Sequence, residues 1–143
     1  MPDMLPQVAT RFIGALAEGD LETVLALADP GLELTIATAP RGVPRTVRGP
    51  EQLAALVGAI DRTWTQVRLR EVQAHAFADD PQRGVVQFLV EASNRDGSPY
   101  RNPYVALVRT SGGLIARWTE YYDPAPMVVA IDALRAHARA ATG

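Results

Sequence analysis

The order of hydrophobic and polar residues predicts two helices at the start of the chain. Between residues 6 and 18, hydrophobic side chains recur at intervals of three and four, the spacing of an amphipathic helix, and Gly19 follows where helices commonly end. Asp20 can cap a second, shorter helix, which the turn sequence at residues 29–31 ends. Each helix therefore presents one apolar face to a core.

The next segments alternate between strand, loop and helix. Residues 32–38 alternate hydrophobic with polar or small side chains, the period of a half-buried strand. Residues 40–50 are rich in proline, glycine and arginine and predict a loop, with a short edge strand around residues 46–47. Pro50 stands at a favoured first helical position and begins a third helix that continues to Ile60.

After residue 61 the pattern changes to long stretches of strand, separated by short sequences that favour hairpin turns. The predicted strands are residues 64–77, 84–93, 100–110 and 114–123. Such a series is an antiparallel meander, and the tail from Pro126 predicts a closing amphipathic helix. We expect an α+β fold in one domain, residues 1–143. Its helices pack on a strongly curved antiparallel sheet that forms a cone with a central pocket, and a C-terminal helix follows.

Composition removes several classes of function. The 143 residues carry a formal net charge of -2, which gives no electrostatic reason to expect nucleic acid as a partner. The absence of cysteine excludes disulfides and thiolate chemistry, and the two distant histidines, His75 and His137, argue against a metal site. The sequence lacks a signal-peptide pattern and a bilayer-spanning apolar run, so we expect a soluble, cytoplasmic protein without a membrane partner.

The strongest candidate for chemistry is Glu120, which stands among aromatic residues on the last predicted strand. Alternation places Trp118, Glu120 and Tyr122 on one face, where they would line a pocket. A carboxyl in a dry, aromatic cavity has a raised pKa and can exchange a proton near neutral pH. Aromatic walls suit planar or polyketide-like molecules. Alternatively, Glu120 faces solvent or pairs with Arg109 on the neighbouring strand.

Tyr100, Asn102 and Tyr104 share one face of the preceding strand. Phenols and an amide can bind a carbonyl or enolate oxygen through hydrogen bonds, so all three are candidate substrate-binding residues, together with Trp118 and Tyr122. A structural interpretation competes with this one. Tyrosines near strand ends commonly keep their hydroxyls in water, and an asparagine before a proline often belongs to a bulge.

Other polar residues have simpler interpretations. Asp123 precedes a proline and is expected to cap the closing helix. His75 lies where the apolar phase drifts, so the pattern does not fix the direction of its side chain. Arg41, Arg45 and Arg48 could cover the pocket mouth and bind a substrate carboxylate bidentately, although a solvated loop is the default for such a run.

Three motifs give the sequence a family resemblance. They are YRNPY at residues 100–104, GGLI at 112–115 and EYYDP at 120–124, set within the predicted order of helices and meander. They resemble the SnoaL-like polyketide cyclase family of the nuclear transport factor 2-like superfamily, over nearly the whole chain. Their spacing is most similar to the phenazine-biosynthesis A/B branch.

The resemblance implies an α+β cone with a deep pocket, usually a homodimer, that performs cofactor-independent acid-base chemistry on small molecules. It also implies that Glu120 occupies the place of the proton-transfer acid of the phenazine branch. In the related ketosteroid isomerases a general-base aspartate stands on the first strand, where this chain has Thr35. The Asp-Arg-Asp set of limonene-epoxide-hydrolase relatives cannot be assembled from these strands.

These observations together predict a cyclase or isomerase without a cofactor or metal, acting on a polyketide-like or other secondary-metabolite intermediate. Glu120 would transfer the proton. The alternative is a non-catalytic module of the same fold that binds a small hydrophobic ligand or serves as a dimeric scaffold. A protein-interaction domain would need an exposed apolar patch on the outer sheet face, which no strand pattern makes obvious.

Overall fold

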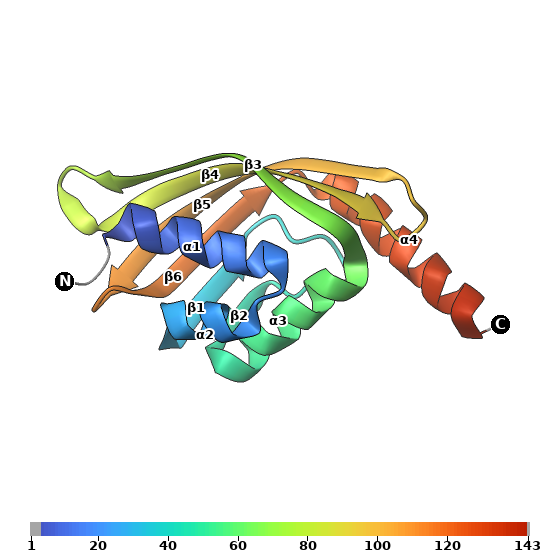
Figure 1. Cartoon of the computed structure of the whole chain (residues 1–143), viewed down its shortest axis with the longest axis horizontal. Coiled ribbons are helices and arrows are strands. Elements are labelled where there is room, and N and C mark those ends of the chain that lie inside the picture. Colours follow the sequence, from blue (N-terminus) through green and yellow to red (C-terminus); the bar gives the residue numbers. More distant parts are fainter. Residues whose placement is uncertain (1–3, 143) are drawn as a thin grey trace.

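The computed structural model describes residues 4–142, so Met1 to Asp3 and Gly143, which the single-domain prediction includes, lie outside the described residues. Within this range the chain forms four helices and six strands (Figure 1). The helices are α1 (Leu5–Glu18), α2 (Leu21–Leu27), α3 (Gly49–Thr63) and α4 (Pro124–Thr142). The strands are β1 (Ala28–Ile36), β2 (Thr46–Arg48), β3 (Trp64–Phe77), β4 (Asp80–Asn94), β5 (Pro99–Ser111) and β6 (Leu114–Tyr122).

The six strands form one sheet in the order β2-β1-β6-β5-β4-β3. The last four strands are joined by hairpins and pair antiparallel, which confirms the predicted meander. The predicted α+β class and the C-terminal helix are confirmed as well. Each predicted helix and strand is present, with ends that differ from the prediction by a few residues.

Two local expectations about β1 are wrong. The sheet is mixed rather than antiparallel throughout, because β1 runs parallel to β6. The alternation of hydrophobic and polar residues within a strand does not indicate which distant strand it pairs with, so the sequence pattern could not predict this pairing. In addition, residues 29–31 do not precede the strand. They lie inside it, at a register shift where the Asp29 carboxylate accepts a hydrogen bond from the Gly31 N–H at 2.7 Å.

The curvature of the sheet originates in β3. Its pairing with β4 shifts register between Thr65 and Arg68 and again between Arg70 and Gln73. Gln66 and Glu71 lie at these shifts, each with a φ of 55°, the left-handed conformation typical of bulges. Bulges bend a strand and increase its twist, so β3 and β4 wrap around the space on the inner face of the sheet.

Helix α1 crosses the sheet and covers much of its inner face (Figure 1). Its buried side chains, Val8 and Phe12 among them, pack against the meander, and the rings of Phe12 and Trp118 have centroids 5.2 Å apart. This packing supplies the core between α1 and β6. None of the helices within residues 4–142 is both long and apolar enough to cross a membrane.

Gly84 marks a close approach between β4, β3 and α1. A Cβ atom there would overlap the His75 carbonyl oxygen and lie 2.8 Å from Leu5 Cδ2. Because one of these neighbours is backbone, we predict that Gly84→Ala lowers the free energy of unfolding by at least about 2 kcal/mol. Urea unfolding followed by circular dichroism measures this change.

The matched control is Gly14→Ala. Gly14 lies inside α1, and a Cβ atom there meets nothing within 4 Å. Alanine favours the helix over glycine, so this variant should be more stable by about 0.5 to 1 kcal/mol. Equal effects of the two substitutions would contradict the close approach at Gly84.

Candidate active site

A cavity of about 360 Å³ lies between the inner face of the sheet, helices α1, α3 and α4, and the loop before β2. Most of its wall is hydrophobic. Representative side chains from α1, β1, α3, β3, β4 and α4 are Leu16, Ile36, Leu56, Trp64, Phe88 and Met127. The cavity therefore favours a small molecule with a largely apolar body.

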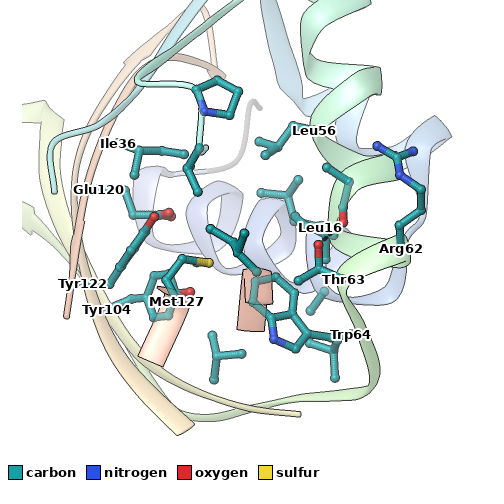
Figure 2. A pocket seen from close by; sticks show the side chains of 18 of the residues that line it. Leu16, Ile36, Leu56, Arg62, Thr63, Trp64, Tyr104, Glu120, Tyr122 and Met127 are labelled. Carbon is teal, nitrogen blue, oxygen red and sulfur yellow. Dashed lines mark hydrogen bonds between the residues drawn. The ribbon is translucent and has the colours of Figure 1, made fainter. Parts of the chain in front are cut away.

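Glu120 projects into this cavity from β6. Figure 2 shows it together with Tyr122 and Tyr104 on one side of the space, facing Trp64 and Thr63 across it. Its neighbours on the adjacent strands are apolar, because Glu120 pairs with Ile36 of β1 and with Ala106 of β5. The side chain is only partly exposed, and that exposure faces the cavity.

The surroundings of Glu120 favour its neutral form. Burial raises the pKa of this carboxyl from 4.5 to about 7, and a hydrogen bond donated by Trp118 opposes the rise. That bond joins Trp118 Nε1 to Glu120 Oε1 at 3.1 Å. Glu120 makes no ion pair with any residue between 4 and 142, and Arg109 is exposed. A carboxyl of this kind can both accept and return a proton near neutral pH.

Tyr122 offers the cavity an unused hydroxyl. The residue is 6% exposed, and among the described residues nothing forms a hydrogen bond with its hydroxyl oxygen. Its ring lies against that of Tyr104, with centroids 4.9 Å apart. Burial raises the pKa of Tyr122, and a negative charge on Glu120 raises it further, so the hydroxyl keeps its hydrogen and remains a donor. Buried donors of this kind usually have a partner, and a bound molecule would supply one.

Tyr100, Asn102 and Tyr104 all face inward from β5, but only Tyr104 lines the cavity. The Tyr100 and Tyr104 hydroxyl oxygens are 2.7 Å apart. Asn102 Nδ2 donates to the Tyr100 hydroxyl at 2.9 Å and to the Asp123 carbonyl at 2.8 Å, and its Oδ1 accepts from the Asp123 N–H. The amide is therefore fully engaged within the protein, and Asn102 and Tyr100 lie behind the cavity wall.

Trp118 also lies behind the wall. It is fully buried, contacts Phe12 and does not line the cavity, so its link to the site is the hydrogen bond to Glu120. Its predicted role in binding substrate by direct contact has no support in this position. The remaining predicted substrate residues divide in the same way: Tyr104 and Tyr122 line the cavity, and Tyr100 and Asn102 do not.

The predicted interpretation of Asp123 is confirmed, because its carboxylate accepts a hydrogen bond from the Ala125 N–H at 3.0 Å, at the start of α4. His75 is exposed and lies outside the cavity wall. Arg45 donates to the Ala37 carbonyl, and Arg48 pairs with Glu33.

The loop before β2 lines the cavity with Gly42, Val43 and Pro44, while its predicted clamp residues Arg41, Arg45 and Arg48 do not take part. Thr38 anchors this loop. Its hydroxyl donates to the Tyr122 carbonyl at 2.8 Å and accepts from the Tyr122 N–H at 3.1 Å.

Sequence reasoning missed two arginines that line the cavity, Arg62 at the end of α3 and Arg135 in α4. Both are exposed at its outer edge. Their positions depend on how α3 and α4 meet, and neither helix pattern distinguishes them from ordinary surface arginines.

With this geometry in place, the comparisons with known proteins identify the class. The SnoaL-like domain family matches residues 9–118, and the chain belongs to that family. A search of curated proteins gives no match. The comparisons do not support the narrower assignment to the phenazine-biosynthesis branch.

Three solved structures illustrate the shared fold. A protein of Pseudomonas putida KT2440, provisionally described as a polyketide cyclase, has a TM-score of 0.75 and 22% identity over 89% of this chain and 97% of that one. A provisionally described isomerase of Bacillus subtilis has a TM-score of 0.73 and 21% identity over 89% and 91%. A nuclear transport factor 2-like protein of Burkholderia xenovorans LB400 has a TM-score of 0.72 and 20% identity over 87% and 92%. The fold is therefore nuclear transport factor 2-like.

The pKa of Glu120 leads to a prediction about stability. Between its unfolded value near 4.5 and its folded value of about 7, the native state binds the proton more tightly than the unfolded chain. The stabilisation from the neutral carboxyl is complete below pH 4.5 and is lost as the pH rises to 7. The free energy of unfolding of Glu120→Gln, measured relative to that of the wild type, should therefore increase by up to about 3 kcal/mol as the pH rises from 4 to 8.

Urea unfolding of both proteins at several pH values measures this difference. The other titrating groups are the same in the two proteins, so their contributions cancel. Glu18→Gln, at an exposed position, is the control and should parallel the wild type at every pH. Parallel curves for Glu120→Gln as well would show that the carboxyl is hydrated in the folded protein.

Proposed function

We propose that this protein is a cofactor-independent cyclase or isomerase that performs acid-base chemistry on a small, largely apolar carbonyl compound, such as a polyketide-like or other secondary-metabolite intermediate. The observation that carries the proposal is Glu120, the one carboxyl that residues 4–142 contribute to the cavity wall, which has apolar neighbours and a pKa of about 7. A cavity that only stored an apolar ligand would gain nothing from a buried acid, which weakens the fold.

In the proposed reaction the Glu120 carboxylate removes a proton from a carbon next to the substrate carbonyl. The electron pair moves to the carbonyl oxygen and gives an enolate, while Glu120 becomes neutral. Returning the proton to another carbon of the conjugated system isomerises the substrate. Attack of the enolate carbon on a second carbonyl of the same molecule forms a ring, and Glu120 then protonates the new alkoxide.

The tyrosines supply the complementary half of this chemistry. Tyr122 has a hydroxyl hydrogen with no acceptor among the described residues, and it can donate to the developing oxyanion. Because Tyr100 accepts from Asn102, it can give its own hydrogen to Tyr104, which leaves the Tyr104 hydrogen for the substrate. Trp118 holds the Glu120 carboxyl in place from behind the wall.

Exchange of a carbon-bound hydrogen tests the proton transfer without knowledge of the natural substrate. In D2O, the protein should incorporate deuterium into 2-tetralone, an aromatic ketone with acidic hydrogens, faster than buffer alone. Glu120→Gln keeps the shape and removes the titrating group, so the rate should fall on the order of 100-fold. Proton magnetic resonance follows the loss of the signal.

Tyr122→Phe should lower the same rate by about 10-fold or more through loss of the oxyanion donor. Glu18→Gln is the control and should exchange at the wild-type rate. Equal rates for wild type and Glu120→Gln, with binding of 2-tetralone retained, would favour the non-catalytic ligand-binding module instead.

We also propose that the chain forms a homodimer through the outer face of the sheet. Contrary to the expectation from the strand patterns, this face exposes Val105 and Leu107 of β5 and Tyr121 of β6. Val105 and Tyr121 are partners across the two strands, so these side chains form a contiguous patch. Their exposed fractions of 40 to 46% leave substantial apolar area for a second copy to cover.

Leu107→Glu places a charge inside this patch and should shift the protein from dimer to monomer in analytical ultracentrifugation, while circular dichroism shows an intact fold. Val128→Glu is the matched control, because Val128 is apolar and 44% exposed but lies on α4. It should leave the dimer unchanged. A wild-type monomer at micromolar concentration would contradict this proposal.

A further inference from the structure

The charged side chains of the cavity wall are segregated. Only three are present within the described residues: Glu120 on the sheet, Arg62 at the end of α3 and Arg135 within α4. Figure 2 shows Arg62 at the outer edge of the cavity, on the side opposite Glu120. Apolar side chains occupy the wall between them. A molecule that fills the cavity therefore meets the Glu120 carboxyl on one side and Arg62 on the other, while Arg135 lines the wall from α4.

Arg135 reaches from α4 to the loop before β2. Its Nη2 atom is 3.1 Å from the position that a Cβ of Gly42 would occupy, so the guanidinium lies directly against the loop backbone. Glycine permits this approach because it has no side chain. Within residues 4–142, the Arg135 side chain has neither an ion-pair partner nor a hydrogen bond. Its donors are therefore available at the edge of the cavity.

The Arg62 guanidinium also lies beside a glycine. Its Nη1 atom is 3.3 Å from the position that a Cβ of Gly58 would occupy, so the side chain folds back along α3. Its carbonyl accepts a hydrogen bond from Arg95 at 2.7 Å, which fixes the backbone at this point. No carboxylate of the described residues pairs with its guanidinium. Both arginines therefore line the same cavity without a carboxylate partner among the described residues.

Neither arginine forms an ion pair with Glu120 or with another carboxylate of the described residues. Each guanidinium can therefore bind an anion from solution. A planar guanidinium with several N–H donors matches a carboxylate, which it can bind bidentately.

We propose that Arg62 and Arg135, with the backbone at Gly42, form an anion subsite that binds the carboxylate of an otherwise apolar substrate. The inference rests on the proposed function and names the substrate class for that site: an apolar carbonyl compound that also carries a carboxylate remote from the reacting carbon. A carboxylate bound at Arg62 lies across the cavity from Glu120, so its negative charge opposes ionisation of the base less than it would beside Glu120.

The test compares two aromatic probes of equal size, 2-naphthoate and its neutral analogue 2-naphthamide, by isothermal titration calorimetry at pH 7.5. The wild type should bind the carboxylate more tightly than the amide. Arg135→Gln should lower the affinity for 2-naphthoate roughly 10-fold, as expected for loss of a charge-assisted hydrogen bond near solvent. It should change the affinity for 2-naphthamide less than about 2-fold. Arg62→Gln should act in the same direction.

Arg139→Gln is the matched control, because Arg139 is an exposed arginine one helical turn beyond Arg135 and does not line the cavity. It should affect neither probe. Equal wild-type affinity for both probes, no binding of 2-naphthoate, or an equal loss in Arg139→Gln would overturn the anion subsite.

This test is independent of turnover. If deuterium exchange into 2-tetralone fails while the preference for 2-naphthoate and its loss in Arg135→Gln persist, the subsite stands and the catalytic role of Glu120 falls. The reverse pattern retains the catalytic proposal and shows that the substrate is neutral.

Discussion

The withdrawal of one carboxyl from water is the constraint on which the site depends. Glu120 shares its cross-strand row with Ile36 and Ala106, and none of these neighbours offers it a charge. Among the described residues, the Trp118 N–H supplies the one side-chain hydrogen bond to the Glu120 carboxyl. This row exists because β1 pairs parallel with β6, which brings an apolar strand against the edge of the meander that would otherwise be open.

The sheet and the helices each form part of the cavity wall. The bulges of β3 bend the sheet, so the inner face encloses space instead of packing flat on α1. Helices α3 and α4 limit that space at its open side. The described residues then give the cavity a largely hydrophobic wall, with Glu120 of β6 and Arg62 of α3 on opposite sides of it. This separation allows a large apolar area to provide binding while the few polar groups fix orientation.

Much of this could be predicted from the sequence. Hydrophobic alternation located all four strands of the meander. It also placed Glu120, Tyr104 and Tyr122 on faces that could line a pocket, and these three side chains line the cavity. The same alternation could not separate Tyr104 from Tyr100 and Asn102, because all three share a face and only the depth of packing decides which one reaches the cavity. Local patterns describe which side of a strand is buried and carry no measure of that depth.

Pairings between distant segments were also beyond local patterns. The parallel contact of β1 with β6, the bulge within β1, and the meeting of Arg135 with the loop at Gly42 each join segments that no periodicity relates. The three loop arginines were attractive candidates because of their density in the sequence. Arg45 instead donates a hydrogen bond to the Ala37 carbonyl, and Arg48 pairs with Glu33. The arginines that line the cavity belong to helices α3 and α4.

Asn102 ties the floor of the cavity to the helix that closes it. Its amide bonds both the N–H and the carbonyl of Asp123, and the carboxylate of Asp123 caps α4. The same amide holds the Tyr100 hydroxyl, which holds Tyr104. One buried amide thus joins the backbone that leads into α4 to the tyrosine row of β5. A substitution of Asn102 would therefore disturb the start of the helix and the tyrosine hydroxyls together.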